Sequence, residues 1–234
     1  MSKLSANLQK GLVGHWTMDD RDTDNGMLRD RSGNDNHGTI NGGIKTSKSG
    51  AIGESYEISG DTPYIATSFG KKLGDDIDAF CISLWCKTDL GGRKWLAGWR
   101  GNNSPHFNWG LNDDLANSGE LWARWRGDAG NSKDLTSSTL INDNSWHHVV
   151  FEMDTSGYGA IYVDSELVDS RSDLDTTADF RDIPIWIGEF NDTGSTHGFP
   201  WGGKIADCRI YNRVLSEQEI NALYNMRSQR TSNI

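Results

Sequence analysis

The stretch Trp201–Tyr224 constrains the fold most, because its pattern indicates one strand followed directly by one helix. Residues 204–211 alternate, which predicts a strand that places Ile205, Asp207, Arg209 and Tyr211 on one face. Ser216 fits a helix N-cap, and Glu219 completes a capping box three residues later. We therefore expect a closing strand and a short C-terminal helix that seals a hydrophobic sheet.

The remainder of the chain consists of short alternating segments between Gly, Asn and Asp residues. The chain holds 27 Gly and 10 Trp with a hydrophobic content of 35%, which favours many short strands. We predict an all-β fold, a two-sheet antiparallel sandwich, with residues 1–10 as an arm and 11–234 as one domain. Strands are expected at 12–18, 38–40, 50–58, 64–67, 80–88, 94–100, 106–111, 120–126, 147–153, 160–163, 166–170 and 182–188.

Five stretches, taken in order, resemble the laminin-G-like, concanavalin A-like lectin–glucanase jelly-roll family. They are the closing stretch together with residues 12–20, 30–39, 80–85 and 145–149. The resemblance spans roughly residues 11–225 and implies a jelly-roll sandwich. It implies less about the ligand, because one fold hosts many functions.

Charge and hydropathy exclude several partners. The formal net charge of −10 argues against nucleic acid and anionic membrane surfaces. No apolar stretch approaches the roughly 18–20 residues that span a bilayer, so we expect no membrane insertion. The three cysteines lack zinc spacing, and we interpret them as small buried hydrophobic residues.

A calcium site is predicted near the paired terminal strands. Ca²⁺ prefers six to eight oxygen ligands, and neighbouring first and last strands would bring Asp19 and Asp207 together. The resemblance implies a calcium ion near this end, with Asp30, Asn34 and Asn36 as weaker loop ligands. The alternative is that the loop residues form Asx turns and that Asp207 pairs with Arg209 or Lys204.

The aromatic middle of the chain predicts a ligand-binding face. Alternation places Trp95, Ala97 and Trp99 on one face of their strand, and Leu121, Ala123 and Trp125 on one face of theirs. The opposite face of the latter strand carries the predicted ligand-binding residues Trp122, Arg124 and Arg126. An exposed Trp beside Arg offers a platform for a sugar ring and donors for its hydroxyls. The alternative is that these tryptophans belong to the core.

The sequence gives little support for glycoside hydrolase activity. Glycoside hydrolysis needs two carboxyl groups about 5 to 9.5 Å apart. The nearest match is Glu152-Met-Asp154, but Ser156 and Gly157 follow where a second acid belongs. We expect no catalytic residues, and we expect His147 and His148 to point to opposite faces.

Two functions follow from the resemblance. The first is a non-catalytic surface module that recognises a glycan or a surface protein and carries a structural Ca²⁺. The second is a virion structural protein, such as a capsid decoration, spike or tail component, that acts in a homo-oligomer or virion assembly. The first ten residues lack a signal peptide, which favours the virion, while the family favours an extracellular place.

Overall fold

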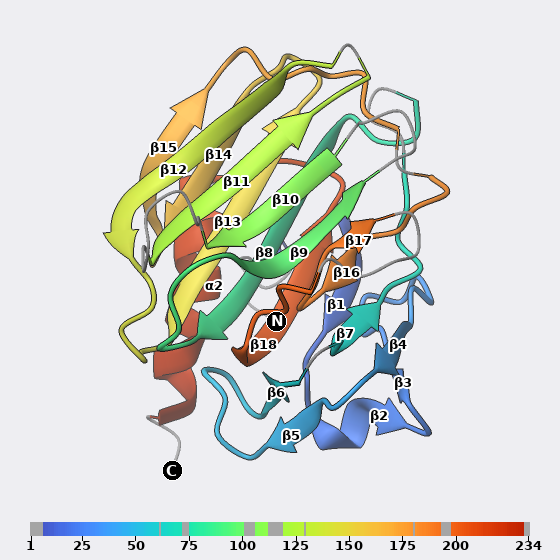
Figure 1. Ribbon diagram of the computed structural model, residues 1–234, viewed down its shortest axis with the longest axis vertical. Helices are drawn as coiled ribbons and strands as arrows, with labels where there is room; N and C mark the ends of the chain where they lie inside the picture. The colour runs from blue at the N-terminus through green and yellow to red at the C-terminus, as the bar shows by residue number, and fades with distance from the viewer. Residues whose placement is uncertain are drawn as a thin grey trace.

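The computed structural model describes residues 7–60, 62–71, 75–100, 106–111, 119–128, 130–179, 181–192 and 198–231. These residues form two packed β-sheets of eight and ten strands and one C-terminal α-helix (Figure 1). The all-β, concanavalin A-like jelly-roll sandwich expected from the sequence is confirmed. Its core is a large cluster of buried side chains between the two sheets.

The first sheet, the helix-side sheet, has the order β15-β14-β13-β8-β18-β6-β5, with β1 also paired to β18. Its strands are β1 (Leu12–Trp16), β5 (Lys45–Ser47), β6 (Ser55–Ile58), β8 (Ala79–Lys87), β13 (His147–Asp154), β14 (Gly159–Val163), β15 (Glu166–Arg171) and β18 (Gly203–Tyr211).

The second sheet has the order β12-β11-β10-β9-β16-β7-β4-β3-β2, with β17 also paired to β9. We call it the groove-side sheet, because its outer face carries the groove described below. Its strands are β2 (Thr23–Asp24), β3 (Met27–Leu28), β4 (Gly38–Asn41), β7 (Tyr64–Ala66), β9 (Lys94–Arg100), β10 (His106–Leu111), β11 (Glu120–Arg126), β12 (Ser132–Leu140), β16 (Trp186–Ile187) and β17 (Asn191–Asp192). A single turn of 3-10 helix, η1 (Asp20–Asp22), precedes β2.

Helix α2 (Glu217–Thr231) covers the outer face of the helix-side sheet, behind β13 and β14 in Figure 1. Its Ile220 and Leu223 pack with Cys81, Val150 and other residues in a second buried cluster. The predicted capping box is present. Ser216 Oγ accepts the Glu219 backbone N–H at 3.3 Å, and Glu219 Oε2 accepts the Ser216 N–H at 2.9 Å.

The predicted single alternation of β18 is wrong at Asp207. The register with β8 shifts between Ala206 and Arg209, and Asp207 adopts a left-handed backbone with φ 47°. This bulge inserts one residue, so Ile205 shares the core face with Cys208 and not with Arg209. A one-residue insertion exchanges the two faces of a strand, because side chains alternate with a period of two.

Strand β12 was not predicted, because its sequence Ser-Lys-Asp-Leu-Thr-Ser-Ser-Thr-Leu lacks a hydrophobic alternation. It is the edge strand of its sheet and buries Leu135 and Ser137. Two predicted strands are shorter than expected: 50–58 reduces to β6, and 182–188 reduces to β16. Hydrophobic content therefore predicted the extent of these two strands poorly.

All three cysteines are free and buried, as expected. In the predicted arm, residues 1–6 lie outside the described residues, while Leu8 is buried with the second cluster beneath α2. Among the described residues, no helix is both long and apolar enough to cross a membrane.

Candidate functional site

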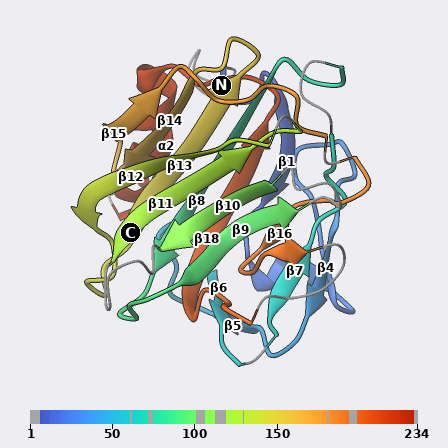
Figure 2. The same ribbon diagram turned by 45° about the horizontal axis from the view of Figure 1, so that its top comes forward.

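The outer face of the groove-side sheet carries three rows of cross-strand neighbours on β9, β10 and β11, which lie side by side in Figure 2. The registers place Gly110 between Trp95 and Trp122 in an aromatic row. The next row is Gly98, Asn108 and Arg124, and the third, the basic row, is Arg100, His106 and Arg126. The sheet thus assembles side chains from three strands into one surface.

Trp95 reaches this face because β9 contains a bulge. The register moves from Trp109↔Ala97 to Gly110↔Trp95, which leaves Leu96 as the extra residue. The prediction that Trp95 shares a face with Ala97 and Trp99 is therefore wrong. The signal that sequence reasoning missed is Gly110, since a strand glycine often marks a bulge. A Cβ at this position would overlap the Lys94 carbonyl oxygen.

The aromatic row forms its own cluster with Phe190, apart from the main core. The Trp95 ring lies 5.9 Å from Trp122 and 5.5 Å from Phe190, measured between centroids. Phe190 fits over Gly98, where a Cβ would come within 2.6 Å of the Phe190 ring. These rings are buried at 2–8% exposure, so ligand contact is confined to their rims and to the groove beside them.

A groove of about 170 Å³ opens beside this cluster. Its lining residues are Arg93, Trp95, Arg100, His106, Asn108, Trp122, Arg124 and Phe190. Two polar atoms of these residues, Trp95 Nε1 and Asn108 Oδ1, are buried and have no hydrogen-bond partner among the described residues. One is a donor and the other an acceptor, which is the pair that a sugar hydroxyl can satisfy.

Guanidinium groups lie over the rings of the groove. Arg124 Cζ is 4.9 Å from the Trp122 ring centroid, and Arg93 Cζ is 5.7 Å from that of Trp95. The Arg124 Nε and Nη2 atoms each donate to Asp134 at 2.7 Å. This bidentate pair fixes the guanidinium plane over Trp122.

Glu189 is fully buried next to Phe190 and was not predicted as part of the site. Burial raises its pKa to about 7, although backbone N–H groups of Phe190, Phe199 and Gly198 oppose the shift. Its Oε1 accepts the Phe190 N–H at 2.9 Å, so the carboxyl group holds the segment that carries Phe190.

The predicted ligand-binding residues share the expected face. Trp122 and Arg124 line the groove, while Arg126 lies in the basic row with its Nε buried. Their counterparts on the opposite face, Leu121, Ala123 and Trp125, belong to the core as predicted. Sequence reasoning missed the other lining residues, because register and loop placement brought them here.

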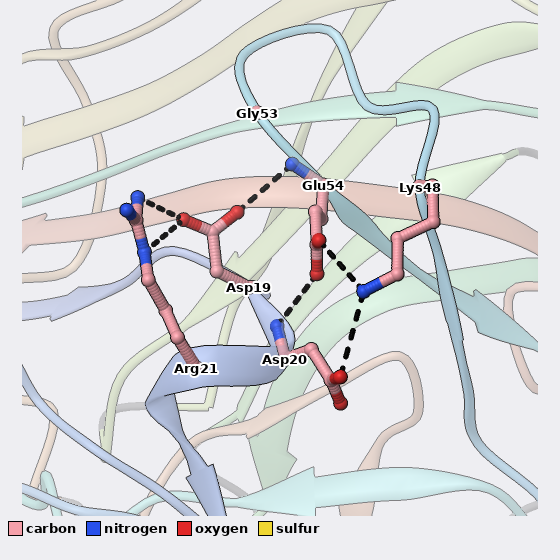
Figure 3. A pocket seen from close by; sticks show the side chains of 6 residues that line it. All are labelled: Asp19, Asp20, Arg21, Lys48, Gly53 and Glu54. Carbon is pink, nitrogen blue, oxygen red and sulfur yellow. Dashed lines mark hydrogen bonds and ion pairs between the residues drawn. The ribbon is translucent and has the colours of Figure 1, made fainter.

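The predicted calcium ligands lie in three separate groups of contacts. Asp19 lines a cavity of about 470 Å³ with Arg21, Lys48 and Glu54 (Figure 3). Its Oδ2 accepts from Arg21 Nη2 at 2.6 Å, and its Oδ1 accepts the Glu54 N–H at 2.8 Å. Both carboxylate oxygens thus have protein donors.

In the loop group, Asp30 accepts the backbone N–H groups of His15, Ser32 and Asn36 at 2.8–3.0 Å. The side chains of Asn34 and Asn36 donate to the carbonyl oxygens of Leu12 and Val13. These contacts stabilise the loop through the Asx-type geometry that the alternative interpretation described.

Asp207 forms the third group. His15 Nε2 is 2.7 Å from its Oδ1, and Arg209 Nε is 3.0 Å from its Oδ2. Burial would raise the pKa of Asp207, but the charge of Arg209 and the contact with His15 outweigh it and lower the pKa. Asp207 is therefore ionised and accepts a hydrogen bond from His15.

Within the described residues, no group of three or more His, Cys, Asp or Glu side chains could hold a metal ion. The three predicted carboxylates therefore do not fit one shared coordination shell in this arrangement. Calcium binding stays a prediction from the sequence.

The residues considered for other chemistry are buried on the helix side. Glu152 is 2% exposed, and its Oε2 accepts the Leu215 N–H at 2.9 Å beneath α2. His147 contacts Asp164 and Asp143, while His148 contacts Ser83. The side chains of the two histidines have separate partners, although Asp164 also accepts the His148 backbone N–H.

A family model for the concanavalin A-like lectin/glucanases superfamily matches residues 59–221. A search of curated proteins found no match. The matched segment contains the three rows of the outer face and most of the helix-side sheet.

Several solved structures are similar in fold. Domain 4 of AbnA, a GH43 extracellular arabinanase from Geobacillus stearothermophilus solved in complex with arabinotriose, has 21% identity and a TM-score of 0.69. That match covers 91% of this chain and 98% of the domain.

The binding domain of Paraclostridial Mosquitocidal Protein 1 has 19% identity and a TM-score of 0.68, covering 93% of this chain and 52% of that one. The ligand-binding domain of botulinum neurotoxin serotype D, solved with N-acetylneuraminic acid, has 15% identity and a TM-score of 0.68. That match covers 95% of this chain and 52% of the other. This chain thus spans about half the length of these two relatives.

Proposed function

This chain belongs to the concanavalin A-like lectin/glucanase superfamily, and on that premise we propose that it is a non-catalytic glycan-recognition module. The binding surface is the groove beside Trp95, Trp122 and Phe190. The observation that carries the proposal is a pair of buried polar atoms at this aromatic surface, Trp95 Nε1 and Asn108 Oδ1, that have no hydrogen-bond partner in the described part of the chain. A saccharide hydroxyl can accept from the first and donate to the second.

Physical chemistry supports an aromatic groove as a sugar site. A saccharide places C–H groups against an aromatic ring and its hydroxyls at the periphery, which suits a site with few polar groups beside rings. The neighbouring Arg124 and Arg93 guanidinium groups supply fixed donors. The solved relatives in complex with arabinotriose and N-acetylneuraminic acid add an analogy at the level of the fold.

The non-catalytic part of the proposal follows from the groove's chemistry. None of the described residues that line it is an acid, whereas glycoside hydrolysis uses two carboxyl groups. Glu152, the acid considered from the sequence, is buried on the other sheet. Incubation of the protein with each bound oligosaccharide, followed by product analysis, tests this part: released shorter sugars would contradict it.

The test of recognition is a glycan array probed with the wild-type protein and the Trp122→Ala variant. We expect the wild type to retain a set of glycans and the variant to lose them, because Trp122 is part of the groove lining and packs against Trp95 and the Arg124 guanidinium group. Leu140→Ala serves as the matched control, since Leu140 is an exposed apolar residue at the end of β12. No retention by wild type, or equal retention by both variants, would contradict the proposal.

The other predictions from the sequence stay open to direct tests. An extracellular place and a surface-protein partner accord with the fold relatives, which are binding domains. A virion structural role or a homo-oligomer stays a prediction from the sequence. Symmetric oligomers measured by light scattering, or location on a particle, would support it.

A further inference from the structure

The basic row is an unusual set of neighbours for a sheet. Arg100 lies opposite His106, and His106 lies opposite Arg126, all on the outer face. Opposite charges at facing positions would stabilise the sheet, but this row holds two arginines with a histidine between them. This chain has 33 acids and a net charge of −10, so acidic neighbours are abundant in its composition. Positions that break a local rule in this way are expected at functional sites.

Two acids of the described residues form ion pairs with arginines of this face. Asp192 is 3.9 Å from Arg100, a long ion pair, and Asp134 is paired with Arg124 in the middle row. Arg126 Nε is buried and has no hydrogen-bond partner among the described residues. Since the described residues that line the groove include three arginines and no acid, we expect its field to favour an anionic ligand.

The register also sets the distance between the aromatic row and the basic row. Trp122 and Arg126 are four residues apart on one strand, which corresponds to about 13 Å. Asn108 and Arg124 occupy the row between them. A ligand that contacts both outer rows must therefore be longer than one pyranose ring.

We propose that the groove binds an acidic oligosaccharide, with one sugar against the aromatic row and a carboxylate or sulfate group against Arg100, His106 and Arg126. This inference rests on the proposed glycan-binding function and names its ligand class. The acidic group supplies a counter-charge for Arg100 and Arg126 and an acceptor for the buried Arg126 N–H.

The experiment compares matched ligands by titration calorimetry and on the array. The carboxylate arm uses an oligogalacturonate and its methyl ester, which has the same backbone without the charge. The sulfate arm uses a sulfated oligosaccharide and its desulfated form. We expect an acidic ligand to bind at least about tenfold more tightly than its neutral counterpart, with affinity falling as salt rises. The arm that binds identifies the acidic group.

The matched variants are Arg126→Gln and Arg29→Gln. Arg29 is about half exposed with one long ion pair to Asp24, so its replacement controls for the loss of one charge. We expect Arg126→Gln to reduce the acidic-to-neutral affinity ratio about tenfold and Arg29→Gln to leave it unchanged. We also expect Arg126→Gln to keep the melting temperature, because Arg126 lies on the outer face and its Nε has no hydrogen-bond partner among the described residues.

The outcomes separate this inference from the proposed function. Equal affinity for acidic and neutral glycans, both lost in Trp122→Ala, would overturn the acidic ligand while glycan recognition stands. Retention of no glycan on an array with uronic, sialylated, sulfated and neutral members would overturn both. Equal binding of polyglutamate and the acidic oligosaccharide would overturn the saccharide specificity.

Discussion

His15 Nε2 lies 2.7 Å from Asp207 Oδ1 and joins the first strand to the last. The partners are 192 residues apart in sequence and neighbours in space, because β1 pairs with β18. Arg209 donates to the same carboxylate from within β18. The acid that stands among the hydrophobic residues of the closing strand thus has two protein partners.

We expect Asp207→Asn to destabilise the fold by about 3 kcal/mol, because it leaves the buried Arg209 charge without its carboxylate. Asn tolerates the left-handed backbone at this position, so the change tests the charge and not the bulge. Urea denaturation measures the loss. The control, Asp24→Asn, alters an exposed ion pair and should cost below about 1 kcal/mol. Equal losses in both variants would contradict the prediction.

Glu152 makes stability depend on pH. Burial raises its pKa to about 7 from 4.5, against the opposing Leu215 N–H and Tyr162 contacts. A raised folded-state pKa contributes stability that is complete below pH 4.5 and is lost as pH rises through 7. The loss is on the order of 3 kcal/mol.

The Glu152→Gln variant should therefore lose less stability than wild type between pH 4.5 and 8. Denaturation curves across this range measure the difference. Glu57→Gln, a change at an exposed strand glutamate, controls for the loss of one charge. Identical slopes for wild type and Glu152→Gln would show that Glu152 is not the titrating group.

Trp122 and Trp125 lie on opposite faces of β11 and should respond differently to truncation. Trp125 is fully buried in the main core, and its Nε1 donates to the Asp175 carbonyl at 2.7 Å. We expect Trp125→Ala to cost about 3–5 kcal/mol. Trp122→Ala removes a ring from a cluster of three residues and should cost clearly less. Thermal denaturation of both variants compares them, and a greater loss in Trp122→Ala would assign that residue to the core.

The calcium prediction requires a measurable response to the ion. Added Ca²⁺ should release heat and raise the melting temperature of chelator-treated protein, because a ligand of the folded state stabilises it. If the Asp19 carboxylate releases Arg21 and binds Ca²⁺ in its place, Asp19→Asn should abolish the response. Asp24→Asn is the control at an exposed acid. If added Ca²⁺ neither releases heat nor raises the melting temperature of the wild type, the calcium prediction is wrong.

Local patterns predicted those parts of the fold that depend on neighbours in sequence. The capping box from Ser216 to Glu219 forms because its partners are three residues apart. Alternation in β11 placed Trp125 and Trp122 on opposite faces, and in the structure the first lies in the main core and the second on the outer face. A strand with one buried face has a hydrophobic residue at every second position, because successive side chains point to opposite faces.

Those patterns did not predict the bulges in β9 and β18. At Leu96 and at Asp207 one extra residue exchanges the faces of a strand, and the position of the extra residue depends on the partner strand. Gly110 and the left-handed backbone of Asp207 accommodate these insertions. Alternation by itself therefore assigned Trp95 and Ile205 to the wrong faces.

The sequence alone determined the sandwich, the closing helix and the side-chain types of the site, because alternation and capping depend on short spacings. The tertiary structure decided which side chains meet. The pairing of β9, β10 and β11 set Trp95 beside Trp122 and set Arg100, His106 and Arg126 in one row. That assembly depends on strand register, and register is fixed by the packing of both sheets together.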